Sequence, residues 1–211
     1  PYPMQVPFLG CIPDIGGPKP SNGQAGYALT ESTRVVRTAL LSRLDSQVCP
    51  ERSRGNGTII LVTSAAGGTG KSSFTLMLGR SLAQAGKRVL LIDADFQEMT
   101  LTKHFKNLCD QSGFIQSLRR RSVYKRHIFQ TETPGLSIVP AGKRGDDGEV
   151  LEEIANGAFQ TCIGKLRKQY DMILLDSPPI LPLADAAILS SQVDGTIMVE
   201  RELVSRRADV I

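Results

Sequence analysis

Residues 59–72 read IILVTSAAGGTGKS, and they predict the architecture that surrounds them. The first four residues are apolar and partly β-branched, which is typical of a buried strand in a parallel sheet. Gly67, Gly68 and Gly70 let the following backbone bend so that several N–H groups point inward. Apolar residues recur at helical spacing from Phe74 onward. The stretch therefore predicts a strand, a glycine-rich loop and a helix in succession.

This succession favours the binding of phosphate, because the N-terminus of a helix carries positive dipole character. The pattern predicts that Lys71 reaches the β- and γ-phosphates of a nucleotide and that the Ser72 hydroxyl is a ligand of Mg²⁺. The usual pattern begins with Gly six positions before the Lys, where this chain has Ala65. A plain glycine turn is the alternative interpretation. The predicted nucleotide-binding residues are Ala66, Gly67, Gly68, Thr69, Gly70, Lys71, Ser72 and Ser73.

Two further apolar stretches end in acidic residues, VLLIDAD at 89–95 and MILLDSPP at 172–179. Ligands of open parallel sheets bind beyond the carboxyl ends of the strands, so we expect both ends to meet the glycine loop. Asp93 and Asp176 are predicted to hold Mg²⁺ together with Ser72. Asp93, supported by Asp95, is also a candidate to accept a proton from an attacking hydroxyl. With Lys71 these two are the candidate catalytic residues. A turn or a helix cap is the alternative for each Asp alone.

The composition is that of one globular domain with an arm. The chain has 211 residues, of which 41% are hydrophobic and 22% are charged, with a net charge of +4. This excludes wholesale disorder, and no run of eighteen apolar residues is present. The four cysteines have neither a metal spacing nor a disulfide density, which indicates a reduced, cytoplasmic compartment. A mild net charge gives no support to a nucleic-acid partner.

The order of elements predicts an α/β fold, a doubly wound and mostly parallel sheet flanked by helices, as in P-loop NTPases. Residues 1–29 are rich in Pro and Gly and are interpreted as an arm, and residues 30–211 as the nucleotide-binding domain. A first helix is expected to start near Thr30 and to end before Pro50. Further strands are predicted at 89–92, 136–139, 172–175 and 196–199, and further helices at 151–166 and 184–189.

Three motifs together resemble a known family. SAAGGTGKS, VLLIDAD and YDMILLDSPP look like the Walker A, Walker A′ and Walker B motifs of bacterial tyrosine kinases. The stretch ESTRVVR at 31–37 fits the ExxRxxR motif of that family, and VPFLGCIPDI at 6–15 resembles its segment between a membrane helix and the kinase domain. The likeness extends over nearly the whole chain.

The resemblance implies an ATP- and Mg²⁺-dependent protein-tyrosine kinase at the cytoplasmic face of the bacterial inner membrane. Such kinases autophosphorylate a C-terminal tyrosine cluster and regulate capsular or exopolysaccharide synthesis with a membrane polysaccharide co-polymerase. A protein-tyrosine phosphatase is a further implied partner. The family forms rings, in which Glu31, Arg34 and Arg37 would lie at the interface between subunits. A solvated charged stripe is the alternative, since residues three apart share one helix face.

Several residues depart from the family pattern. Gln97 stands where the family's Walker A′ motif has Arg, and the loop lacks the family's Pro-Gly-Glu-Gly. The four tyrosines, Tyr2, Tyr27, Tyr124 and Tyr170, are scattered, so we expect that a C-terminal strand and a tyrosine-rich tail are missing from this chain. Two other hypotheses remain. One is an ATPase switch of the MinD/ParA type, although the signature Lys of that group is replaced by Ala66. The other is a degenerate nucleotide-binding regulator.

One charged stretch stands apart from these motifs. Arg119, Arg120, Arg121, Lys125 and Arg126 place five positive charges in eight residues. A solvated surface is the first interpretation. The alternative is an acidic partner, such as a tyrosine-rich tail, a phosphotyrosine or an anionic lipid.

Overall fold

The computed structural model describes residues 7–13, 24–47, 56–143, 148–180 and 188–201. The chain divides into two compact units, residues 1–52 and residues 53–211. Residues 30–52, which the sequence analysis grouped with the nucleotide-binding domain, thus lie in the first unit. No helix among the described residues combines the length and the apolar character needed to cross a bilayer.

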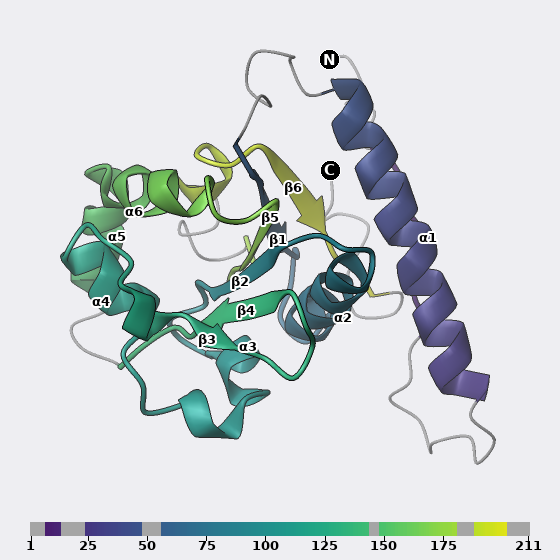
Figure 1. The fold of residues 1–211 in the computed structure, drawn as a ribbon, viewed down its shortest axis with the longest axis horizontal. Helices are drawn as coiled ribbons and strands as arrows, with labels where there is room; N and C mark the ends of the chain where they lie inside the picture. Colours follow the sequence, from purple (N-terminus) through teal and green to yellow (C-terminus); the bar gives the residue numbers. More distant parts are fainter. Residues whose placement is uncertain (1–6, 14–23, 48–55, 144–147, 181–187, 202–211) are drawn as a thin grey trace. The chain divides into compact units, whose positions relative to one another are not determined.

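The first unit is built on one long helix, α1 (Gln24–Gln47), shown in purple and blue in Figure 1. It begins six residues before the predicted start at Thr30, because no proline lies between Pro20 and Pro50 and a helix tolerates the single Gly26 at a cost of about 1 kcal/mol. Gly10, in the described segment 7–13, lies close to this helix. A Cβ on Gly10, whose φ is +152°, would come within 2.9 Å of the Val36 side chain.

The second unit contains a six-stranded sheet in the order β3-β4-β2-β5-β1-β6. All neighbouring strands are parallel except β3 and β4, so the predicted mostly parallel sheet is confirmed. The strands are β1 (Thr58–Thr63), β2 (Val89–Asp93), β3 (Phe129–Gln130), β4 (Leu136–Val139), β5 (Met172–Asp176) and β6 (Gly195–Met198).

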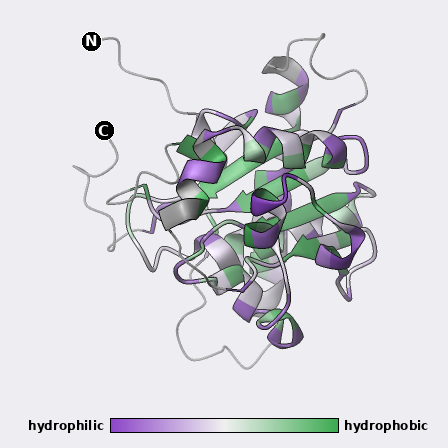
Figure 2. Ribbon diagram, turned by 90° about the vertical axis from the view of Figure 1, so that its left-hand side faces the viewer, coloured by the Kyte–Doolittle hydropathy of each residue, from purple (hydrophilic) through white to green (hydrophobic). Residues whose placement is uncertain are grey.

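Helices cover both faces of this sheet (Figure 1). One face is covered by α2 (Lys71–Gln84), which approaches so closely that a Cβ on Gly79 would meet Leu91 at 2.7 Å. Alternate strand residues, such as Ile59 and Leu90, belong to the core cluster beneath the helices of the opposite face. Those helices are α4 (Phe114–Arg119), α5 (Gly148–Ala155) and α6 (Ala158–Leu166). The strands are accordingly mostly hydrophobic, with many polar residues on the helices (Figure 2).

Two features of the helices test the sequence interpretation. The prediction of a single helix over residues 151–166 was wrong, because Gly157, which has a left-handed backbone (φ +80°), separates α5 from α6. The end of α2 agrees with the glycine rule: Gly86 and Lys87 donate to the carbonyls of Ala83 and Leu82, which completes a Schellman motif. The helix predicted at 184–189 falls largely outside the described residues. The short elements α3 (Thr100–Lys103), α4, β3, η1 (Lys106–Leu108) and η2 (Lys125–His127) were not predicted.

Candidate nucleotide-binding site

The glycine loop joins β1 to α2 at the carboxyl edge of the sheet. Gly68 and Gly70 have φ values of +76° and +92°, and a Cβ on either would meet no atom within 4 Å. The left-handed backbone, rather than crowding, therefore requires glycine at these two positions. The helix starts directly after Gly70, whose carbonyl accepts the Phe74 N–H at 2.9 Å. The first N–H groups of α2 thus stay open to a phosphate group.

The sheet order brings the two acidic strand ends beside this loop. Strand β5 lies between β1 and β2, so Asp176 is paired in register with Val62 on one side and with Asp93 on the other. Neighbouring strands lie about 4.8 Å apart. The structure therefore brings Asp93, Asp176 and the loop together at one edge.

Among these carboxylates, Asp176 has the oxygen that is best placed to bind a cation. Its Oδ1 accepts a hydrogen bond from the Thr75 hydroxyl at 3.2 Å, and Ser72 also donates to the carboxylate. Its Oδ2 is buried and has no hydrogen-bond partner among the described residues. Burial raises the pKa of Asp176 to about 6, against the opposing effects of Ser72 and the Lys71 ammonium. An unpartnered carboxylate oxygen beside a serine hydroxyl is a donor set that fits Mg²⁺.

Asp93 is held differently, because hydrogen bonds engage both of its oxygens. Oδ2 accepts from the N–H and the hydroxyl of Thr102, both at 2.7 Å, and Oδ1 accepts from the Asp95 N–H at 3.1 Å. Burial and the charge of Asp176 raise the pKa of Asp93 to about 7. Asp95 in turn accepts the Glu98 N–H at 2.9 Å. Both carboxylates thus shape the segment that follows β2.

The donors available to a metal are therefore few. Within the ranges that the structure describes, no three His, Cys, Asp or Glu side chains are grouped as a metal site. Of the predicted trio of Ser72, Asp93 and Asp176, the pair Ser72 and Asp176 includes an oxygen without a described hydrogen-bond partner, whereas both oxygens of Asp93 accept hydrogen bonds. Mg²⁺ commonly takes one or two protein ligands and completes its shell with waters and phosphate oxygens, so this pair is sufficient.

Three polar contacts at the site escaped the sequence analysis. Thr75 contacts Asp176 from the next turn of α2, and helical spacing could have revealed it. Thr102 holds Asp93 from α3, for which no sequence pattern gave a signal. Glu200 accepts the Ala65 N–H at 2.8 Å and so anchors the start of the loop. Since β6 pairs with β1, the carboxyl end of β6 was a place to look for such a residue.

The remaining predicted residues are those of the expected subunit interface. Glu31, Arg34 and Arg37 lie on α1, in the other compact unit. Arg34 Nη1 and Glu31 Oε1 form an ion pair at 2.6 Å within that helix. An interface that uses these residues must therefore compete with a pair that already exists inside the helix.

A strand, a left-handed glycine loop and a helix, with an open carboxylate on the adjacent strand, define the class of P-loop nucleotide-binding proteins. The model of the family described as "AAA domain" matches residues 57–206. Because the match covers more than half of the chain, this chain belongs to that family.

Curated relatives give a more specific comparison. The chain is 32% identical to the tyrosine-protein kinase ptk of Acinetobacter johnsonii over 171 residues, 81% of this chain and 22% of that protein. It is 36% identical to the tyrosine-protein kinase CpsD of Streptococcus agalactiae over 141 residues, 67% of this chain and 61% of that protein. The resemblance to bacterial tyrosine kinases is thereby confirmed, although the chain spans only part of each relative.

Solved structures agree with this comparison. The structure titled "BceF Tyrosine Kinase Domain" superimposes with a TM-score of 0.76 at 27% identity, over 97% of this chain and 85% of that one. MinD, the septum site-determining protein of Pyrococcus horikoshii, was solved with Mg-ADP. It gives a TM-score of 0.57 at 25% identity, over 68% of this chain and 57% of that one. Both similarities confirm the P-loop fold.

Proposed function

We propose that this chain is the catalytic domain of an ATP-dependent protein-tyrosine kinase that regulates capsular or exopolysaccharide synthesis and export. The observation that carries the proposal is the unpartnered Oδ2 of Asp176 beside Ser72 and Lys71, because it supplies an open Mg²⁺ position next to the phosphate loop. The similarity to proteins named tyrosine-protein kinases supports tyrosine as the acceptor.

The residues divide the work of phosphoryl transfer between them. Lys71 and the loop N–H groups would stabilise the negative charge on the phosphoryl group as it moves from ATP to the tyrosine oxygen and leaves ADP. Ser72 and Asp176 would hold Mg²⁺, which supplies positive charge between the phosphates when bound. The hydroxyl proton of tyrosine leaves to a carboxylate or to water.

Asp93 and Asp95 are proposed to support this chemistry, and two roles for Asp93 remain to be separated. A pKa of about 7 suits proton acceptance, whereas the hydrogen bonds from Thr102 suit a positioning role. Thr102→Val leaves the carboxylate in place and removes the hydroxyl contact. A fall in kcat that a rise in pH reverses supports proton acceptance, and a pH-independent fall supports positioning.

The assembly belongs to the same proposal. We propose that subunits associate in a ring through Glu31, Arg34 and Arg37, and that the acceptor is a tyrosine-rich tail of a neighbouring subunit. A membrane polysaccharide co-polymerase region, in the same or a partner chain, would place the domain at the cytoplasmic face of the inner membrane. A protein-tyrosine phosphatase would reverse the reaction. The resemblance of the motifs supports each of these partners.

The test is incubation of the chain with γ-labelled ATP, Mg²⁺ and a tyrosine-rich peptide. The expected result is label on tyrosine, which Lys71→Met and Asp176→Ala abolish. Arg88→Gln serves as a control, since its ion pair with Asp171 lies near the amino ends of β2 and β5 and outside the site. Label on tyrosine that persists in Lys71→Met would refute the assignment of the site.

A second candidate, an ATPase switch, is favoured by one departure in the sequence and by one comparison. Gln97 stands where the kinase motif has Arg, and the fold also matches MinD with bound Mg-ADP. In the same assay this candidate predicts release of free phosphate without label on tyrosine. A nucleotide-binding regulator without catalytic activity predicts neither product.

A further inference from the structure

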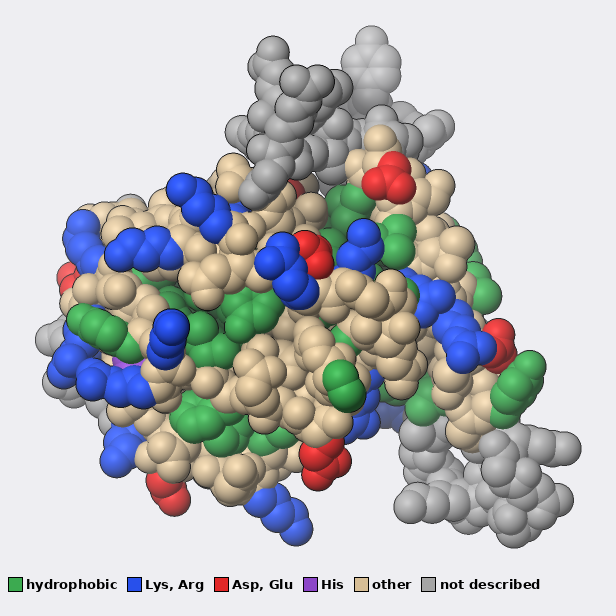
Figure 3. Space-filling model, viewed as in Figure 1, with side chains coloured by type: hydrophobic (Ala, Val, Ile, Leu, Met, Phe, Trp, Pro, Cys, Tyr) green, Lys and Arg blue, Asp and Glu red, His purple; other side chains and the backbone are tan. Residues whose placement is uncertain are grey.

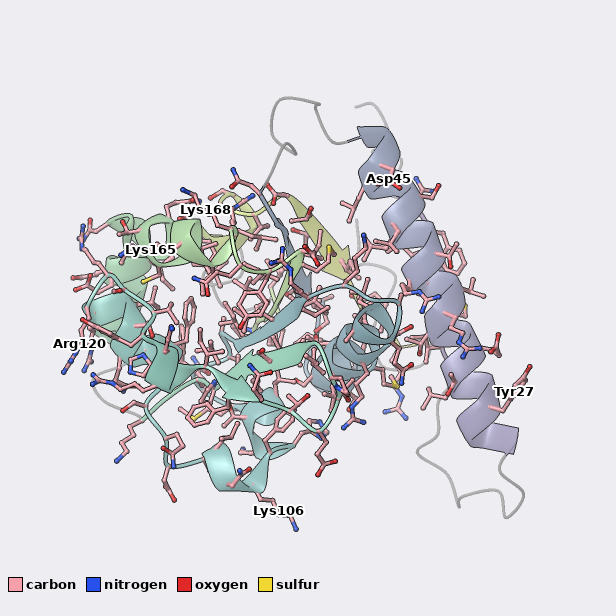
Figure 4. The ribbon with its side chains drawn as sticks, in the orientation of Figure 1. Tyr27, Asp45, Lys106, Arg120, Lys165 and Lys168 are labelled. Atoms are coloured by element: carbon pink, nitrogen blue, oxygen red, sulfur yellow. The ribbon has the colours of Figure 1, made fainter. Side chains whose placement is uncertain are left out.

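A cationic surface lies on the helical layer of α4 and α6, and the proposed site does not use it. It consists of the exposed residues Arg120, Arg121, Lys125, Arg126 and Lys165, and we call it the arginine surface. Figure 3 shows Lys and Arg side chains gathered on the left of the view, and Figure 4 shows Arg120 and Lys165 pointing outward there.

The five side chains come from residues 120–126 and from α6, and Ser117 bonds to a residue beside each of these groups. Burial lowers the pKa of His127, and Arg126 and Arg120 lie close enough to lower it further. Burial raises the pKa of Cys162 to about 11, and Arg121 and Lys165 lie close enough to oppose this rise. Ser117 bonds to both: its hydroxyl lies 2.8 Å from His127 Nδ1, and its carbonyl accepts from Cys162 Sγ at 3.1 Å. The charged side chains therefore share one surface, which surrounds the buried residues Ser117, His127 and Cys162.

No carboxylate of the described residues neutralises these cations. In the described parts of the chain, none of the five residues of the arginine surface forms an ion pair. Like charges held close together without acidic partners repel each other, and an anion that bridges them relieves this repulsion. The surface is thus suited to a ligand with concentrated negative charge.

Arg126 is partly ordered before any ligand arrives. Its guanidinium carbon lies 4.9 Å from the ring centroid of Tyr124, and its Nε lies 3.4 Å from His127 Nε2. His127 is itself buried and packs edge-on against Tyr124 at 5.6 Å between centroids. This arrangement engages the ring face and Nε and leaves the two terminal nitrogens of Arg126 for a ligand. A fixed guanidinium fork matches the oxygens of a phosphate group.

We propose that the arginine surface binds a phosphotyrosine-containing peptide segment, supplied by a second copy of the kinase or by its substrate. Diffuse attraction to a membrane needs charge alone, whereas three arginines, one of them held by an aromatic ring and a histidine, favour a discrete phosphate. The exposed ring of Tyr124 adds an aromatic contact beside the charges. The inference rests on the proposed function, because phosphotyrosine is the product of that reaction.

The test is fluorescence anisotropy with a short labelled peptide that carries several phosphotyrosines, compared with the same peptide without phosphate. We expect the phosphorylated peptide to bind more tightly, and the double variant Arg120→Gln/Arg126→Gln to weaken binding about tenfold or more. Arg126→Lys retains the positive charge and loses the guanidinium fork. Its affinity for the phosphorylated peptide is therefore expected to lie between those of the native chain and the double variant. Lys87→Gln/Lys106→Gln removes the same charge from other exposed positions and serves as the matched control.

Three outcomes overturn the inference. The first is equal affinity for the phosphorylated and the unphosphorylated peptide. The second is an equal loss of affinity for the phosphopeptide in the arginine variant and in the matched control. The third is that binding to phosphatidylglycerol vesicles requires the arginines whereas binding to the phosphopeptide does not. All variants alter exposed side chains, and unchanged melting temperatures check their folding. Because the peptide is synthetic, its binding is measured even if the chain shows no kinase activity. Failure of the proposed function is thus distinguished from failure of this inference.

Discussion

The phosphate loop contains a side chain whose replacement should stabilise the protein. Thr69 is buried, with 7% of its surface exposed, and its hydroxyl has no hydrogen-bond partner in the part of the chain that the structure describes. Thr69→Val exchanges that hydroxyl for a methyl group of similar shape and retains the main-chain N–H. The variant therefore removes an unsatisfied polar group without opening a cavity.

The magnitude follows from the cost of that unsatisfied group. A buried donor or acceptor without a partner costs about 1–3 kcal/mol, and the lower end applies to a loop that can adjust. We expect Thr69→Val to raise the free energy of unfolding by about 1 kcal/mol. For a chain of this size that corresponds to a rise of about 2–4 °C in melting temperature.

The assay is thermal and urea unfolding of the nucleotide-free protein. Thr69→Ser serves as the control, because it keeps the hydroxyl and removes a buried methyl group, with an expected loss of about 1 kcal/mol. Opposite signs for the two variants support the account. If Thr69→Val lowers stability by about 1 kcal/mol, the hydroxyl has a partner and the reasoning fails.

Three further predictions concern the site, the buried histidine and the packing of α2. Lys71→Met should abolish stabilisation by Mg-ATP in a thermal shift assay, because the phosphate charge loses its main partner; a shift equal to the native one would contradict this. Burial together with Arg126 and Arg120 lowers the pKa of His127, so the contribution of His127 to stability should fall as the pH drops below about 6.5, whereas the raised pKa values of Asp93 and Asp176 act in the opposite direction. Urea unfolding of the native chain and of His127→Asn across that range isolates this contribution: the stability of the native chain relative to the variant should fall with pH by at most about 1.4 kcal/mol per pH unit, and a difference that is independent of pH would contradict it. Gly79→Ala should cost about 1–3 kcal/mol because its Cβ would meet Leu91, whereas Gly164→Ala in α6 meets nothing and should be neutral or stabilising; equal effects would contradict the packing described.

The parallel strands could be predicted from the sequence because each is a continuous apolar run. Val89–Ile92 and Met172–Leu175 lie within β2 and β5, and their acidic ends followed from the rule for open sheets. The end of α2 could also be predicted, because glycine at position 86 readily adopts the left-handed backbone that ends a helix. These features depend on neighbours in the sequence.

The features that escaped depend on contacts between distant residues. The break at Gly157 lies inside an amphipathic pattern that continues across it, so periodicity alone could not reveal it. The two-residue β3 exists only through its pairing with β4. Thr102 lies nine residues along the sequence from its partner Asp93, and Glu200 lies 135 residues from its partner Ala65. No local sequence pattern encodes such contacts.

The central claim, that the site transfers phosphate from ATP to tyrosine, is tested most directly by phosphoamino-acid analysis after incubation with γ-labelled ATP. The native chain with Mg²⁺ and a tyrosine-rich peptide should yield labelled phosphotyrosine, and Asp176→Ala should yield none. Free phosphate without phosphotyrosine, or equal labelling of tyrosine by both proteins, would contradict the account.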